Sequence, residues 1–112
     1  MTLSDHQWQF LQHVSELIRF AAYQGIKLTG GELYRPAEMQ EIYYKKGLTK
    51  TKNSNHLRKL AIDFNFFIDG KLTYSHEKLK ILGAFWESLS PLNRWGGNFK
   101  SINDTPHFER NV

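Results

Sequence analysis

Two histidines and two aspartates in the second half of the chain are of the types that build a metal site. His56 and His107 each lie where a loop is predicted to meet a strand, and Asp63 and Asp104 lie near them in the sequence. Three protein ligands of this kind leave a fourth zinc position for water, whose pKa then falls to about 7. A carboxylate that does not bind the metal can take the proton of that water. These residues therefore indicate metal-assisted hydrolysis.

Asp63 is the most unusual of the four, because it interrupts an apolar run from Leu60 to Ile68. An ionised carboxylate in such a run is costly unless it is paired, hydrogen-bonded or bound to a metal. A strand at the edge of a sheet, with its polar face in water, would explain the residue equally well. The pattern alone leaves both interpretations open.

The spacing of these residues sets conditions on the fold. His56 and Asp63 are seven residues apart, which is about 23 Å on a straight strand and about 10 Å on a helix. Zinc ligands lie about 2 Å from the metal, so the chain must fold back near residues 57–59 if both bind one ion. Asp104 and His107 would lie on opposite faces of an ideal strand. A turn at 103–106, which the Asn-Asp-Thr-Pro sequence indicates, could aim both into one cavity.

Other residues are weaker candidates for chemistry. Glu109 shares a strand face with His107 and could compete with Asp104 as a base, but the spacing of about 7 Å favours a salt bridge or a supporting role. Trp95, beside two glycines, is the best aromatic candidate for lining a cleft. Exposed side chains are expected for the remaining histidines, which are His6, His13 and His76.

Helices and strands alternate along the predicted fold. Helices are predicted from Ser4 to near Gly25, from Pro36 to near Gly47, and from Ser75 to before Pro91. Strands are predicted at 26–29, 60–68 and 107–109. The first helix begins with a capping box from Ser4 to Gln7, and a hairpin turn is predicted at 69–70. This order of elements predicts an α+β fold.

The composition of the chain excludes some classes of protein and of metal site. The 112 residues, of which 40% are hydrophobic and 23% charged, suit one globular domain spanning 1–112. No run of 18 apolar residues predicts a transmembrane helix, and residues 1–6 have no features of a secretory signal. The chain has no cysteine, so a metal site must use histidines and carboxylates. The net charge of +4 suggests an anionic partner, either nucleic acid or a polymer such as a cell wall.

Two segments resemble a known family. Residues 54–63, SNHLRKLAID, resemble the S-x-H-x-x-G-x-A-x-D motif of the zinc D-Ala-D-Ala carboxypeptidases and L-alanyl-D-glutamate endopeptidases. Residues 95–97, WGG, followed by 104–109, DTPHFE, resemble the ending of that family. The resemblance implies the hedgehog/DD-peptidase-like fold, a small domain in which helices pack against an antiparallel sheet that carries a zinc site. Lys59 replaces the glycine of the first motif, and glycine permits turns that lysine resists.

The resemblance also implies roles for individual residues. The zinc ligands would be His56, Asp63 and His107. Asp104 would be the general base. Arg35, which follows the glycine-containing turn at 30–31, would hold the substrate carbonyl and its developing oxyanion. Ser54 would contact the substrate.

The resulting expectation is a zinc-dependent peptidoglycan peptidase that hydrolyses the stem peptide. The Asp-x-x-His ending and the small size favour an L-Ala-D-Glu endopeptidase, and D-Ala-D-Ala carboxypeptidase activity stays open. The similarity to phage lysins implies a monomeric endolysin that is made in the cytoplasm without a signal peptide and acts on the cell wall after release. The basic stretch 45–59 would hold the enzyme on the anionic wall.

Two other functions fit parts of the sequence. The stretch 45–59, with Tyr43 and Tyr44 before it, is compatible with a nucleic-acid-binding module or a metal nuclease. Its basic residues do not recur on one helical face and no known binding motif is present, so we expect no nucleic-acid partner. A wall-binding relative without activity is disfavoured, because Asp104 accompanies the three candidate ligands.

Overall fold

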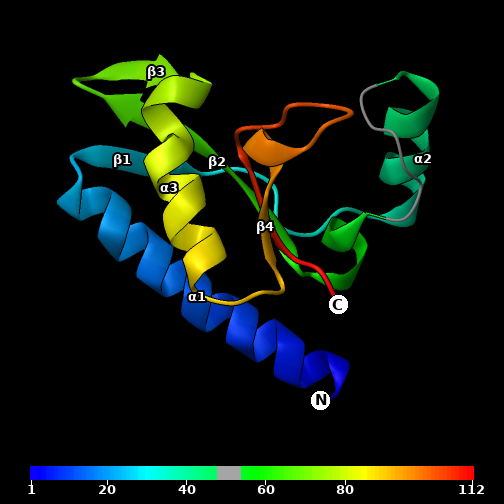
Figure 1. Cartoon of the computed structure of the whole chain (residues 1–112). Coiled ribbons are helices and arrows are strands. Elements are labelled where there is room, and N and C mark those ends of the chain that lie inside the picture. The colour runs from blue at the N-terminus through cyan, green and yellow to red at the C-terminus, as the bar shows by residue number, and fades with distance from the viewer. Residues whose placement is uncertain (48–53) are drawn as a thin grey trace.

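The computed structural model describes residues 1–47 and 54–112 and confirms the α+β fold (Figure 1). Its helices are α1 (Leu3–Tyr23), α2 (Ala37–Lys45) and α3 (His76–Ser88), with short 3-10 helices η1 (Asn55–Arg58) and η2 (Gly96–Asn98). Its strands are β1 (Ile26–Gly30), β2 (Ala61–Ile68), β3 (Lys71–Thr73), β4 (Asn93–Trp95) and β5 (His107–Arg110). None of the helices in the described ranges is long and apolar enough to cross a membrane. Much of the basic stretch 45–59, namely 48–53, lies outside the described residues.

The strands pair in an antiparallel sheet. Their order is β1-β2-β5-β4, and β3 pairs with β2 as the second arm of a hairpin. This hairpin turns at Asp69 and Gly70, whose φ angles of 52° and 77° are those of the predicted two-residue turn. β2 pairs with β1 along one part of its length and with β5 along the other. The pairing with β5 places Asp63 directly opposite His107.

Two helices bury the core against one face of the sheet. α1 and α3 lie together across that face, whereas α2 stands apart on the other side of the molecule (Figure 1). Phe64 and Phe66 of β2 belong to this core. Because successive strand side chains alternate between faces, Asp63 and Asn65 point to the opposite face. The largest fully buried apolar side chains are Trp86, Trp95, Phe10, Phe66, Phe108, Leu17, Leu60, Leu79 and Leu82.

Helix α1 begins earlier than predicted. Its N-cap is Thr2, whose hydroxyl accepts a hydrogen bond from the backbone N–H of Asp5 at 3.1 Å. The Asp5 carboxylate accepts one from the backbone N–H of Thr2 at 2.9 Å, which completes a capping box. This box replaces the one predicted from Ser4 to Gln7, because Asp5 also places a negative charge at the positive end of the helix.

The histidines outside the candidate site differ in exposure. His76 is exposed as predicted, but His6 is half-buried and accepts a hydrogen bond from Arg110 at 3.1 Å. His13 is buried and hydrogen-bonds to the side chain of Asn93 at 3.2 Å. The prediction was wrong for His6 and His13. They are seven residues apart and therefore share a face of α1, and this face turns toward β4 and β5.

Two strands were not predicted. β3 and β4 have three residues each, which is too short for a period-two pattern to be recognised. β4 matters for the site, because it lies at the edge of the sheet beside β5 and places Arg94 opposite Glu109.

Candidate active site

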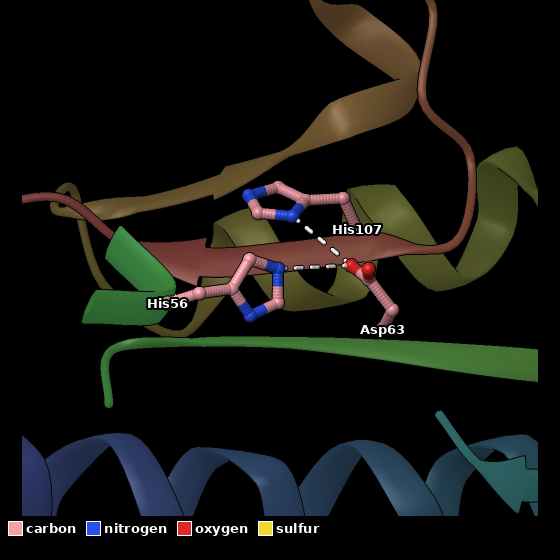
Figure 2. A group of neighbouring side chains, drawn as sticks. All are labelled: His56, Asp63 and His107. Atoms are coloured by element: carbon pink, nitrogen blue, oxygen red, sulfur yellow. Dashed lines mark hydrogen bonds and ion pairs between the residues drawn. The ribbon is translucent and has the colours of Figure 1, made fainter. Parts of the chain in front are cut away.

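Three of the four candidate residues meet at the junction of β2 and β5, as Figure 2 shows. His56 lies on η1, Asp63 on β2, and His107 is the first residue of β5. Asp63 Oδ1 lies 3.4 Å from His56 Nε2 and 3.1 Å from His107 Nδ1. Both imidazoles are buried, whereas the Asp63 side chain is 26% exposed. The cluster is therefore held inside the protein and meets solvent at its carboxylate.

Helix η1 makes the reversal that the spacing of His56 and Asp63 requires. The hydroxyl of Ser54 caps this helix by accepting a hydrogen bond from the backbone N–H of His56 at 3.2 Å. Lys59 ends it with φ 57° and ψ 38°, the left-handed conformation, after which the chain enters β2. The expected fold-back near residues 57–59 is therefore present. Lysine adopts here the kind of conformation for which glycine is best suited.

The conformation of Lys59 has a testable cost. We expect Lys59→Gly to be more stable than Lys59→Ala by about 1 kcal/mol, because a Cβ atom is disfavoured by about that amount in the left-handed region. Alanine is the matched control, since both variants remove the contact between Lys59 Nζ and the Tyr34 ring, 5.4 Å from its centroid. Chemical denaturation measures the difference, and equal free energies of unfolding would contradict the strained conformation.

Hydrogen bonds outside the cluster decide which nitrogen of each imidazole is free. His56 Nδ1 lies 2.8 Å from the carbonyl oxygen of Leu33, which only accepts, so Nδ1 carries the proton. His107 Nε2 lies 2.7 Å from a Glu109 carboxylate oxygen, which likewise places a proton on Nε2. In the neutral imidazoles, the free lone pairs on His56 Nε2 and His107 Nδ1 then both face Asp63 Oδ1. A metal ion bound between these three acceptors, or a second proton on His107 Nδ1, removes the repulsion between them.

The spacing of these acceptors suits zinc. Two atoms bound tetrahedrally at about 2.0–2.1 Å from zinc lie about 3.3 Å apart, and the distances to Asp63 Oδ1 are 3.1 and 3.4 Å. The three ligand atoms all lie within 4.8 Å of one another. His56 Nε2 is buried and has no hydrogen-bond partner in the part of the chain described. Two imidazoles and one carboxylate form a set that zinc binds with a fourth position left open.

Opposite charges inside the cluster shift the pKa values of Asp63 and His107. Burial opposes ionisation of Asp63, but the hydrogen bond with His107 and the His56 imidazole 3.4 Å away outweigh it and hold the pKa of this carboxyl below its usual range. Burial also opposes protonation of His107, yet Asp63 and Glu109 on its two sides raise the pKa of the imidazole to about 9. Without a metal, a proton therefore occupies His107 Nδ1, and a metal ion has to compete with it.

Asp104 lies in the same cleft as the cluster. Its backbone N–H donates to the carbonyl of Gly96 at 2.8 Å, and its own carbonyl accepts from the backbone N–H of His107 at 3.1 Å. The predicted turn thus brings Asp104 and His107 into one cleft. Burial raises the pKa of the Asp104 carboxyl, His107 opposes this and Asp63 adds to it. The carboxylate makes no hydrogen bond within 1–47 and 54–112, so it is free to accept a proton.

The Asp104 turn rests on residues 95–97. A Cβ atom on Gly96 would lie 2.1 Å from the Asp104 carbonyl oxygen and 2.8 Å from His107 Cβ, so this close approach requires glycine. The sequence suggested that Trp95 lines a cleft, but Trp95 is 1% exposed and is not in the wall of this one. It contributes instead to a second pocket beside α3. Its indole N–H donates to the carbonyl of Thr105 at 2.9 Å. The segment 95–97 therefore positions the turn and does not form a surface for substrate.

Gly96→Ala should damage both the fold and the site. We expect it to lower the free energy of unfolding by about 1–3 kcal/mol, because the added methyl group collides with backbone that cannot move independently. Gly30→Ala is the matched control, since a Cβ atom there has no neighbour within 4 Å. Thermal unfolding of both variants measures the effect, and equal melting temperatures would show that the 104–107 turn can shift freely.

Arg35 reaches the cleft from the segment before α2. Its Nε donates to the Glu32 carboxylate, its Nη1 donates to Gln40 at 2.5 Å, and its guanidinium lies 4.8 Å from the centre of the Tyr43 ring. These three contacts fix the guanidinium at the cleft wall, while Nη2 has no hydrogen bond to the described residues. Ser54 lines the cleft as well, and its hydroxyl is the cap of η1.

Glu109 holds His107 and is not free to act as a base. One of its carboxylate oxygens contacts His107, and the other accepts from Arg94 Nε at 2.7 Å and Nη2 at 2.5 Å. Hydrogen bonds with His107 and Arg94 outweigh burial and lower the pKa of the Glu109 carboxyl. The supporting role expected for Glu109 is therefore present. No sequence pattern indicated Arg94, because its strand has only three residues and was not recognised.

One cleft of about 530 Å³ collects these groups. Its lining includes all six residues to which the family resemblance gave a role, namely Arg35, Ser54, His56, Asp63, Asp104 and His107. The arrangement offers a metal position, an unpaired carboxylate and a fixed guanidinium on one wall, which are the parts needed for metal-assisted hydrolysis of a carbonyl compound.

Comparison with known families agrees with this chemistry. A family model described as D-alanyl-D-alanine carboxypeptidase matches residues 48–110, which is more than half of the chain. The chain belongs to this family. It is a zinc-dependent peptidase of peptidoglycan, and zinc is its cofactor, as the sequence predicted. A search of curated proteins gave no match.

Two solved structures share the fold of the peptidase. The Serratia marcescens L-Ala D-Glu endopeptidase ChiX is 22% identical, with a TM-score of 0.68 over 84% of this chain and 74% of its own. The vancomycin resistance D,D-pentapeptidase VanY from a VanB-type cassette, an E175A mutant in complex with Zn(II), is 19% identical. Its TM-score is 0.59, and the match covers 91% of this chain and 70% of that one.

Proposed function

We propose that the peptidase binds one zinc ion through His56, Asp63 and His107 and cleaves the L-Ala–D-Glu bond of the stem peptide. The observation that carries this proposal is that His56 Nε2, Asp63 Oδ1 and His107 Nδ1 face one another. Asp63 Oδ1 lies 3.1 Å from His107 Nδ1 and 3.4 Å from His56 Nε2. The Leu33 carbonyl and the Glu109 carboxylate each hold a proton on the opposite nitrogen of the imidazole, so the nitrogen that faces Asp63 is available to a metal once His107 has lost its second proton.

Each of the cleft residues has a separate role in the proposed reaction. When bound, zinc supplies a Lewis acid that polarises the scissile carbonyl and lowers the pKa of the attacking water. Asp104 takes a proton from this water and returns it to the nitrogen of the leaving amine. Arg35 donates N–H groups to the carbonyl oxygen as negative charge develops on it. Glu32 and Gln40 hold Arg35 in place, so the guanidinium needs no reorientation during the reaction.

Two features favour the L-Ala–D-Glu bond over D-Ala–D-Ala. The general base position is an aspartate three residues before the last histidine. ChiX, described as an L-Ala D-Glu endopeptidase, has the higher TM-score of the two solved structures, 0.68 against 0.59. The alternative bond shares the same chemistry, so the products have to decide between them.

Digestion of purified peptidoglycan with and without a chelator tests the proposed function. Mass spectrometry of the products should find new amine termini at D-Glu, and these should disappear when the metal is removed and return when zinc is added. New termini at D-Ala would move the cleavage to the other bond. Products that are unaffected by the chelator would contradict the zinc mechanism, and DNA and RNA in the same digest should stay intact.

We further propose that the peptidase is a monomer that acts as an endolysin on the wall after release from the cytoplasm in which it is made. Its net charge of +4 supports action at an anionic polymer. Purified protein applied to permeabilised bacteria should lower the turbidity of the suspension. Unchanged turbidity alongside active cleavage of isolated peptidoglycan would separate the enzyme from the lytic role.

A further inference from the structure

Arg94 is a cleft residue that the mechanism above does not use. It lies on the edge strand β4, directly opposite Glu109 on β5, and its side chain is 50% exposed. Its guanidinium lies 5.3 Å from the centre of the Phe99 ring, and that ring lies 5.6 Å from the ring of His107. The Glu109 carboxylate and the Phe99 ring therefore each link Arg94 to the candidate metal ligand His107.

The hydrogen bonds of Arg94 use only part of its guanidinium. Nε and Nη2 both donate to the same oxygen of Glu109, at 2.7 and 2.5 Å. An arginine carries five N–H donors in a planar fork, so Nη1 and the second N–H of Nη2 remain. No described residue accepts a hydrogen bond from them. The ion pair with Glu109 fixes the plane of the fork, and the remaining donors lie in a cleft wall that solvent reaches.

The other two arginines of the described cleft wall are used differently. Arg35 is committed to Glu32 and Gln40 and is assigned to the scissile carbonyl. Arg58 Nη1 donates to the Val112 carbonyl at 3.3 Å, and its Nη2 donates to Asn55. Arg94 is the one that combines a fixed plane, a half-exposed side chain and contact with the residue that holds His107.

A fixed, partly free guanidinium selects a planar anion such as a carboxylate. In the L-Ala–D-Glu segment of a stem peptide, the chain continues through the γ-carboxyl of D-Glu. The free α-carboxylate is therefore attached to the carbon that bears the leaving nitrogen. A terminal D-Ala presents a carboxylate at the same place. Either group lies about one residue, roughly 3.3–3.6 Å, beyond the scissile bond.

We infer that Arg94 binds the α-carboxylate of the substrate residue on the leaving side of the scissile bond. This inference rests on the proposed function, because it needs a peptide substrate at the metal position. Arg94 thereby makes the peptidase selective for a free carboxylate over a carboxamide at this residue. The same contact would serve D-Glu or a terminal D-Ala.

Matched peptides test the inference. The first pair is L-Ala-γ-D-Glu-L-Lys and the same peptide with D-isoglutamine, and the second pair ends in D-Ala-D-Ala with a free carboxylate or an amide. For the pair that is cleaved, the wild-type protein should favour the carboxylate form by about 10- to 100-fold in kcat/KM, the range for hydrogen bonds to a charged group. Arg94→Gln should bring this ratio close to one, mainly by raising KM for the carboxylate form.

The ratio of kcat/KM for the carboxylate and amide peptides distinguishes direct binding of the substrate by Arg94 from an indirect effect of Arg94 through Glu109. If Arg94 acts only through Glu109 and His107, Arg94→Gln lowers both rates equally and the ratio keeps its wild-type value, which would overturn the inference. A wild-type ratio near one would overturn it as well. Arg58→Gln removes a cleft arginine of equal charge and should leave the ratio unchanged. If the ratio also falls to about one in Arg58→Gln, the selectivity comes from the total positive charge of the cleft and not from Arg94.

A binding measurement keeps the two proposals apart. If the wild-type protein cleaves neither pair, the proposed function fails. Calorimetric titration of the zinc-loaded protein with the same peptides then tests Arg94 alone. Tighter binding of the carboxylate form that is lost in Arg94→Gln supports the inference, and equal affinity for both forms overturns it.

Discussion

Asp104→Asn is expected to lower the rate of peptidoglycan hydrolysis by about 10²–10⁴-fold, the usual contribution of a general base. Asparagine has nearly the same shape and keeps the backbone hydrogen bonds of the turn to Gly96 and His107, so the fold should survive. The carboxylate has no partner among the described residues whose loss would destabilise the protein. Zinc content should stay at the wild-type level and the free energy of unfolding should change by less than about 0.5 kcal/mol.

The same substitution at Asp69 is the control. Asp69 lies in the β2–β3 turn with φ 52°, a conformation that asparagine also tolerates, and it is not part of the cleft. Asp69→Asn should therefore hydrolyse peptidoglycan at the wild-type rate. Wild-type turnover in Asp104→Asn would remove Asp104 from the reaction. Loss of zinc in that variant would make Asp104 a metal ligand.

Asp63→Ala should abolish zinc binding and all zinc-dependent hydrolysis. The carboxylate is the only anionic member of the ligand cluster, and both histidine lone pairs face its Oδ1 atom. In the wild-type protein, zinc at a hundred times its dissociation constant should add about 2.7 kcal/mol to the free energy of unfolding, because the ligands converge only in the folded state. Asp63→Ala should show no such increase.

Thermal unfolding with and without zinc measures this difference, and metal analysis gives the stoichiometry. Asn65→Ala is a suitable control, because Asn65 shares the strand face of Asp63 but is not among the cleft residues or the clustered ligands. Its zinc-dependent stabilisation should equal that of the wild-type protein. Full zinc occupancy in Asp63→Ala would refute the ligand assignment.

Much of the site follows from local sequence patterns. The seven-residue spacing of His56 and Asp63 required a reversal near 57–59, and η1 with the left-handed Lys59 provides it. The Asn-Asp-Thr-Pro sequence indicated a turn, and this turn brings Asp104 and His107 to one cleft. These features were predictable because each depends on residues that are close in the chain.

Features that depend on distant segments were not predictable. The tautomer of His56 is set by the carbonyl of Leu33, which is 23 residues away. The orientation of Arg35 is set by Glu32 and Gln40, which are three and five residues away but whose side-chain contacts follow no repeat. No periodic pattern indicates such contacts. Arg94 was missed because β4 has only three residues, and the burial of Trp95 was missed because its partner Thr105 lies across the cleft turn.

The most direct measurement is a crystal structure of the zinc-loaded protein with anomalous data collected at the zinc edge. We predict one strong peak between η1, β2 and β5. His56 Nε2, an Asp63 carboxylate oxygen and His107 Nδ1 should each lie about 2.0–2.2 Å from it. Asp104 should face it without ligating, and Glu109 should keep its contact with His107 Nε2. A peak elsewhere, or ligation by His107 through Nε2, would contradict the account.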